Sequence, residues 1–352
     1  MQSRTKVEPT PPIGVIDSFG KGFETVMSQI ALISIPLLLD VFLWLGPRLS
    51  VAELFRNFGS LVTRGEDVPV ESAQILEMSF NSLAESLNLF SFLSTSPLGV
   101  PSMVISKIGL SPLGEGLVIS ITSWLTAAIV VFVVSLAGLF LGVIYFAVIA
   151  QGTLPSEKKL EDSELLESIW TGWVRIVGFA IGIVLAMIVF GVAVSMLAGL
   201  GALVHSSVSG LVVSLGVAIW VWGLFYVAFA AHGIVMNNET VNTAIRNSLL
   251  LVRFNMPSVV GLFGLIVLLL WGLGYLWLIP ASDSWVLLIG IVGHAFVATG
   301  LYASTFHFYK DRMRWTGEVQ IVKSGSSESL GVVKRALRGN KDNGEKYKEE
   351  DN

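Results

Sequence analysis

The chain has 352 residues, of which 53% are hydrophobic and 14% are charged, and its formal net charge is −4. Soluble domains carry roughly 25% charged residues, so this composition excludes a soluble enzyme, a nucleic-acid-binding protein and a disordered chain. A mean hydropathy of +0.74 predicts instead a protein that crosses the lipid bilayer several times. The sequence contains no cysteine, which also excludes disulfide bonds, thiol catalysis and cysteine-ligated metals.

The N-terminal segment, residues 1–25, is predicted to lie in the cytoplasm and to form an amphipathic helix. Apolar side chains recur there at the spacing of one helical face, at Val15, Phe19, Phe23 and Val26. The first membrane span follows at 26–46 and is the weakest of the spans, because it contains Pro36 and Asp40. Proline removes a backbone donor, so we expect this span to be kinked.

A long loop, residues 47–123, is predicted on the outer side of the membrane. Two of its stretches have the apolar periodicity of amphipathic helices. Their apolar faces are Leu54, Phe55, Phe58, Leu61 and Val62 in the first, and Leu76, Phe80, Leu83, Leu87 and Phe90 in the second. Three prolines predict irregular structure over 94–112. We expect the loop to be a structural lid; a cap over a cavity and a docking surface for a partner are the alternatives.

Residues 124–308 contain five further spans, which long uncharged runs place at 124–149, 176–203, 210–235, 257–280 and 285–308. The predicted fold is therefore an all-α bundle of six transmembrane helices.

A threefold repeat is also indicated, since the stretches before the third and fifth spans repeat the apolar spacing of the N-terminal helix. The matching residues are Leu165, Ile169, Trp173 and Ile176, and then Val241, Ile245, Leu249 and Val252. Each unit is predicted to be an interfacial amphipathic helix followed by a hairpin of two spans. The alternative is that any segment that enters a membrane has such a face.

The distribution of Lys and Arg orients the chain. The loop at 47–123 holds four of these residues, and the remainder lie in the N-terminal segment, in the loops at 152–175 and 236–256, and in the tail. The positive-inside rule then places both termini in the cytoplasm. The tail, 309–352, is predicted to be basic, with a short helix at 332–338 and disorder at its end. Its first residues are predicted to anchor it at the membrane surface, through Lys310, Arg312, Arg314 and Trp315.

Polar side chains within the spans are costly and often functional, and two of them stand out. Asp40 lies about 12 Å inward from Arg48, and His294 lies about 15 Å inward from Ser284, at the helical rise. These depths predict a buried, hydrogen-bonded Asp40–His294 pair if the first and sixth spans adjoin. A proton-coupled or substrate-binding site is the functional interpretation. A structural polar contact, or an Asp40 side chain that reaches the outer interface, is the alternative.

The remaining histidines and glycines suggest ordinary structural roles. His232 and His307 fall near span ends, so we expect them at the membrane interface. Gly178 and Gly182 form a G-x-x-x-G pattern, which indicates close helix packing within the monomer; a dimer face is the alternative.

Motifs for soluble-enzyme chemistry are absent from the sequence. There is no G-x-x-x-x-G-K-[ST] phosphate loop, no H-E-x-x-H zinc motif and no G-x-S-x-G nucleophile turn. The four histidines are far apart in the sequence and do not support a metal site. We therefore assign no catalytic residue, no cofactor and no metal ligand.

Two stretches resemble known membrane proteins. Glu239–Asn255, with the sequence ETVNTAIRNSLLLVRFN, resembles a recurrent element of bacterial polytopic proteins, including the membrane domain attached to some glycerophosphodiester phosphodiesterases. Ile35–Arg48, with the sequence IPLLLDVFLWLGPR, is similar to the first span of uncharacterised Chloroflexi-type membrane proteins. The resemblance implies a multi-pass protein of the bacterial inner membrane. It implies no activity, because the residues of the phosphodiesterase catalytic domain are missing.

Three function classes remain, and the sequence ranks them. A non-enzymatic protein that organises the membrane or forms part of a complex fits the few buried charges and the amphipathic helices. A transporter of a small molecule or lipid, with a polar site at Asp40 and His294, is the alternative. An intramembrane enzyme ranks last, because it needs several convergent reactive groups. The lipid bilayer is the predicted partner, a membrane-protein partner is left open, no nucleic acid is expected, and the oligomeric state is not assigned.

Overall fold

The computed structural model describes residues 12–63, 70–95, 98–106, 111–114 and 116–324. The α-helices in this part of the chain are α1 (Val15–Ser28), α2 (Ser34–Leu45), α3 (Ala52–Thr63), α4 (Val70–Ser86), α5 (Trp124–Gly152), α6 (Asp162–Ala202), α7 (Ser206–Val227), α8 (Ala230–Asn237), α9 (Val241–Trp277) and α10 (Leu287–Ser324). The 3-10 helices are η1 (Ile30–Ile33), η2 (Leu89–Leu93), η3 (Val104–Ser106) and η4 (Ser156–Lys158). Two short strands, β1 (Arg48–Ser50) and β2 (Val118–Ser120), pair in parallel. The predicted all-α class is confirmed.

Several helices meet the requirements of a membrane span. Among the described residues five are long and apolar enough, namely α5, α6, the α7–α8 pair, α9 and α10. A sixth span exists if α1 and the following η1–α2 segment act together, although they are bent by 98°. The chain is thus a multi-pass integral membrane protein.

The first span is not one continuous helix over 26–46. The chain breaks at Gln29, where φ is −138°, and α2 is then only about 18 Å long. The span is bent as predicted, but the bend lies at Gln29 and not at Pro36. Pro36 occupies the first turn of α2, where the missing amide would have had no helical acceptor.

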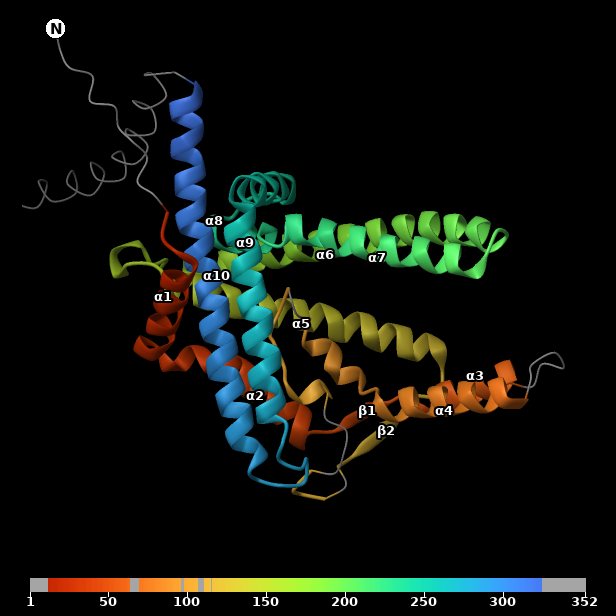
Figure 1. Cartoon of the computed structure of the whole chain (residues 1–352). Coiled ribbons are helices and arrows are strands. Elements are labelled where there is room, and N and C mark those ends of the chain that lie inside the picture. Colours follow the sequence, from red (N-terminus) through yellow and green to blue (C-terminus); the bar gives the residue numbers. More distant parts are fainter. Residues whose placement is uncertain (1–11, 64–69, 96–97, 107–110, 115, 325–352) are drawn as a thin grey trace, which may run out of the picture.

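The bent pair nevertheless extends along α10 from one end of its apolar part to the other (Figure 1). Near one end, the backbone amide of Ile13 donates to Asp311 Oδ2 at 2.8 Å. Near the other end, Trp44 Nε1 donates to the carbonyl oxygen of Ser282 at 2.7 Å. The helix between Leu287 and Asp311 is about 36 Å long at the α-helical rise, enough to cross a bilayer. The two contacts therefore place the ends of the bent pair beside the two ends of this part of α10.

The three repeat units differ in how the amphipathic stretch meets its span. In the first unit the chain breaks between α1 and η1. In the second, α6 continues without interruption from Asp162 to Ala202. In the third, α9 is kinked at Asn255, two residues before Pro257. A helix separate from the span is therefore present in the first unit and, before the kink, in the third; the prediction of such a helix in every unit is wrong for the second.

The hairpin formed by α6 and α7 projects sideways from the α9–α10 pair (Figure 1). Its apolar surface is largely uncovered by protein. Only 6% of the most apolar stretch of α7–α8 is buried, against 61% in α10. The molecule thus has a well-packed part around α10 and an exposed apolar arm.

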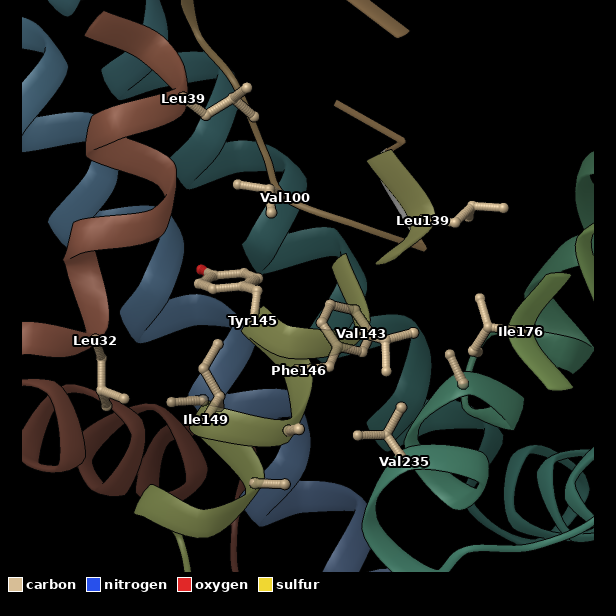
Figure 2. Packing of buried hydrophobic residues seen from close by; sticks show 14 of the residues in the cluster. Leu32, Leu39, Val100, Leu139, Val143, Tyr145, Phe146, Ile149, Ile176 and Val235 are labelled. Atoms are coloured by element: carbon tan, nitrogen blue, oxygen red, sulfur yellow. The ribbon is translucent and has the colours of Figure 1, made fainter. Parts of the chain in front are cut away.

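The principal core surrounds α5. Its side chains Tyr145, Phe146 and Ile149 are at most 1% exposed. Figure 2 shows them between Leu32 and Leu39 of the first unit on one side and α6 and α8 on the other. Tyr145 donates its hydroxyl hydrogen to Thr299 Oγ1 of α10 at 3.1 Å. The helix α5 therefore connects the first unit to the rest of the protein.

The C-terminal helix continues past the predicted span at 285–308. Because α10 extends to Ser324, the start of the predicted tail is helical. The predictions for 332–338 and for the disordered end of the tail lie outside the described residues.

Candidate functional site

Asp40 is the acidic residue that α2 places in the interior, and its exposed fraction is 0%. Its neighbours come from the outer loop. Ser102 Oγ donates to Asp40 Oδ1, the amide of Met103 donates to the same oxygen at 3.1 Å, and the amide of Val104 donates to it at 3.3 Å. A carboxyl group that accepts several such bonds can be buried without the full cost of losing water.

These donors belong to a segment of the outer loop that descends into the protein. Val100 is completely buried, and Figure 2 places it beside Tyr145 of α5. Ser94 Oγ donates to the carbonyl oxygen of Val100 at 2.7 Å and closes the turn. We call the described part of residues 94–106 the inserted segment. Irregular backbone at such depth is tolerated only where protein or water satisfies its polar groups, and Asp40 satisfies two of its amides.

Two glycines of α5 make room for the inserted segment and for η2 before it. A Cβ atom on Gly142 would lie 2.4 Å from the Cα atom of Gly99. A Cβ atom on Gly138 would lie 2.6 Å from the carbonyl oxygen of Phe92. The absence of side chains at these two positions therefore permits direct backbone-to-helix contact.

The structure brings Asp40 and His294 together. His294 Nδ1 lies 3.5 Å from Asp40 Oδ2, and both side chains are buried. The predicted hydrogen bond is not formed, since Nδ1 has no hydrogen-bond partner among the described residues. Asp40 instead accepts hydrogen bonds from the inserted segment. The sequence did not predict these donors.

A signal for the inserted segment was present in the sequence. No charged residue occurs from Ser86 to Ser106. This run is as uncharged as a membrane span, but Pro97, Gly99 and Pro101 interrupt it and exclude a continuous helix. An uncharged run broken by proline and glycine is what an inserted, non-helical segment requires.

A pocket of about 620 Å³ adjoins Asp40 and His294. Its walls come from the inserted segment, from α9 and from His294. Ser102 contributes a hydroxyl group, while Trp271 and Tyr275 are largely exposed at its rim. Pockets of 300–1,000 Å³ are the usual size for small-molecule sites. The pocket is thus large enough for a ligand and is mostly apolar.

The three residues Ser102, Asp40 and His294 do not have the connections of a hydrolytic triad. In such a triad histidine lies between serine and the acid and removes the serine proton. Here the Ser102 hydroxyl donates directly to Asp40, and His294 approaches the acid from the other side. The three residues therefore do not form the serine–histidine–acid arrangement of such a triad.

The predicted membrane-surface anchor is only partly at the surface. Lys310 and Arg314 are exposed, and Arg314 pairs with Asp311 at 2.7 Å. Arg312, by contrast, is 6% exposed and donates to the carbonyl oxygen of Ile13 at 2.9 Å. Trp315 is half-buried. The surface role predicted for Arg312 is therefore wrong, because its guanidinium group connects the N-terminal segment to α10.

The two histidines expected at the interface are engaged within the protein. His232 is 5% exposed, and its ring centroid lies 4.5 Å from that of Phe306. Its Nε2 atom lies 2.7 Å from Thr305 Oγ1. His307 Nε2 lies 2.9 Å from Thr25 Oγ1 of α1. Position near a span end did not reveal these contacts, because they are made with residues of other helices, Thr305 of α10 and Thr25 of α1.

Comparison with known proteins adds no relative. No protein-family model, curated protein or solved structure matches this chain. Within the described residues there is also no group of three or more His, Asp or Glu side chains that could hold a metal ion. The contacts and cavities of the described residues are therefore the structural basis for a proposed function.

Proposed function

We propose that this integral membrane protein is non-enzymatic and acts as a membrane-organising protein or as a subunit of a membrane complex. The observation that carries the proposal is the exposed α6–α7 hairpin. From Ile176 to Val227 its two helices carry no charged side chain, and their most apolar stretches are only 11% and 6% buried, as expected for surfaces that contact lipid or another membrane protein.

The arrangement of the buried polar groups supports this proposal. Asp40 holds the inserted segment in place, and His232 and His307 bond to threonines of the same protein. Groups that satisfy one another stabilise a fold, whereas catalysis requires reactive atoms that face a substrate. The polar interior is therefore better suited to structure than to chemistry.

We also propose a location, the bacterial inner membrane with both termini in the cytoplasm. The resemblance of 35–48 and 239–255 to bacterial membrane proteins supports the first part. The basic loops, and the contact of Ile13 with Asp311, support the second.

Site-specific photo-cross-linking tests the complex-subunit role. A photoreactive amino acid replaces Val189 of α6, which is 71% exposed, and the matched control replaces Leu125 of α5, also 71% exposed. We expect the probe at 189 to form an adduct with one membrane protein, identified by mass spectrometry, in a yield well above that of the control. Lipid adducts alone at both positions would contradict a role as a subunit.

A second candidate is a transporter of a small molecule or lipid. The observation in its favour is the pocket of about 620 Å³ that is lined by His294 and Ser102. Transport requires that this pocket open to the other side of the membrane. Its test is loss of uptake or export in His294→Ala while the folding and abundance of the protein are unchanged.

A further inference from the structure

Two neighbouring cavities lie where the α6–α7 hairpin meets α9 and α10. One has a volume of about 360 Å³ and the other about 380 Å³. They share four wall residues, namely Phe179, Ile183, Leu224 and Val227. The two cavities therefore adjoin, and we call the pair of them the hairpin groove. It is distinct from the pocket at His294, although Leu270 contributes to both walls.

Three glycines keep the hairpin groove open. Gly178 and Gly182 of α6 and Gly223 of α7 line it, and a Cβ atom added to any of them would meet nothing within 4 Å. The sequence pattern at Gly178 and Gly182 predicted close helix packing, and that prediction is wrong among the described residues. These glycines leave a space that side chains would otherwise fill.

The inner end of the groove is closed by a polar pair. Thr305 Oγ1 donates its hydrogen to the carbonyl oxygen of Tyr302 at 2.7 Å. A hydroxyl group has one hydrogen, so Thr305 must accept from His232 Nε2, which lies 2.7 Å away. At this end the Thr305 hydroxyl is fully bonded, while His232 Nδ1 is buried and has no hydrogen-bond partner among the described residues. The remaining walls are aliphatic and aromatic, so the occupant that matches them is a hydrocarbon.

We propose that the hairpin groove binds an acyl chain of a membrane lipid. Its walls are continuous with the exposed apolar surface of the hairpin, so hydrocarbon chains of the bilayer are its immediate neighbours. An α-helix is about 10 Å wide or more, too wide for cavities of these volumes. A single hydrocarbon chain fits cavities of this size with an apolar lining. This inference does not depend on the proposed role as a complex subunit.

Filling the groove from within provides the test. Gly182→Leu adds a side chain where the protein leaves space, and Gly199→Leu makes the same change on α6 at a residue that has nothing within 4 Å and does not line the hairpin groove. The probe is phosphatidylethanolamine with a diazirine in its acyl chain, added to the purified protein in mild detergent. Each buried methylene contributes about fourfold to affinity, so displacing two or more predicts a loss of about tenfold or greater.

We expect cross-links at Phe179, Ile183 or Leu224 in the wild-type protein and in Gly199→Leu, and a loss of about tenfold at these residues in Gly182→Leu. Equal labelling of all three proteins at these residues would overturn the proposal. So would cross-links confined to outward residues such as Val189. A dimer that Gly182→Leu dissociates would assign the groove to a second copy of the chain instead. Gly223→Leu replaces Gly182→Leu if that variant does not fold.

Discussion

At the scale of single residues, Asp40 shows how a buried acid can serve a fold. Its carboxyl oxygens accept from one hydroxyl and two amides of the inserted segment, and none of these donors has a helical alternative. Removing the acceptor takes this partner from the two buried amides and from the half-buried hydroxyl of Ser102, and a buried group left unsatisfied costs roughly 1–3 kcal/mol. His294 makes no such bond through Nδ1, so its loss should matter much less.

We therefore predict that Asp40→Ala lowers the free energy of unfolding by about 3 kcal/mol or more, because it orphans the donors of the inserted segment. We predict that His294→Ala lowers it by about 1 kcal/mol or less. Thermal unfolding in detergent and the abundance of each variant in the membrane check both predictions. The control is Asp283→Ala, which changes an exposed residue. An Asp40→Ala protein as stable as wild type, but with an altered cell phenotype, would instead assign Asp40 a direct functional role.

The sequence could predict part of this site and not the rest. The depths of Asp40 and His294 follow from the regular rise of a helix, and the structure places the two side chains close together. The donors at 102–104 lie on irregular backbone, for which no periodicity relates residue number to position. The burial of Arg312 and His232 depends on neighbours from distant parts of the chain, such as Ile13 and Thr305.

At the scale of elements, α5 and the inserted segment depend on each other. The segment lies against Gly142, where even one extra carbon would collide with the backbone of Gly99. We predict that Gly142→Ala destabilises the protein by about 2 kcal/mol, the usual cost of overpacking. Gly191→Ala is the matched control in α6, because a Cβ atom there meets nothing. It should be neutral or stabilising by up to about 1 kcal/mol, as alanine favours the helix.

Thermal unfolding of both variants and limited proteolysis of the inserted segment measure these effects. Cleavage near 98–104 should become faster in Gly142→Ala and stay unchanged in Gly191→Ala. If both variants behave alike, the contact between α5 and the segment contributes nothing to stability.

Helix positions were more predictable than helix boundaries. Long uncharged runs locate the five long spans, since burial in lipid demands apolar side chains throughout. The junctions between the amphipathic stretches and the spans were not predictable from spacing alone. In α6 no proline separates the two parts, and the helix continues, whereas Pro257 accompanies the kink in α9. Similar apolar spacing therefore produced three different junctions.

At the scale of the whole molecule, the bent α1–α2 pair decides on which side the N-terminus lies. If the pair crosses the bilayer, there are six spans and Lys21 lies on the same side as Arg314. If the pair enters and leaves on one side, there are five spans and the two residues lie on opposite sides. The contacts of Ile13 with Asp311 and of Trp44 with Ser282 favour the crossing.

The natural absence of cysteine allows a direct test. Single cysteines replace Lys21, Arg314, Asp283 and Ser207, the last at the tip of the α6–α7 hairpin, and intact cells are treated with a membrane-impermeant maleimide. We predict labelling of Asp283→Cys and Ser207→Cys only, because in the proposed orientation the positive-inside rule places the other two positions in the cytoplasm. Lysed cells, in which the exposed positions 21 and 314 become reactive, provide the control.

Each departure from this pattern has one structural meaning. Labelling at 21 but not at 314 would show that α1 and α2 fail to cross, and would reduce the protein to five spans. Protection at 207 would show that the sideways hairpin of Figure 1 does not reach the outer surface. Its apolar faces would then lie along the membrane rather than through it. The complete pattern would establish that the bend of 98° interrupts a span without ending it, because Asp40 and α10 hold its two halves in place.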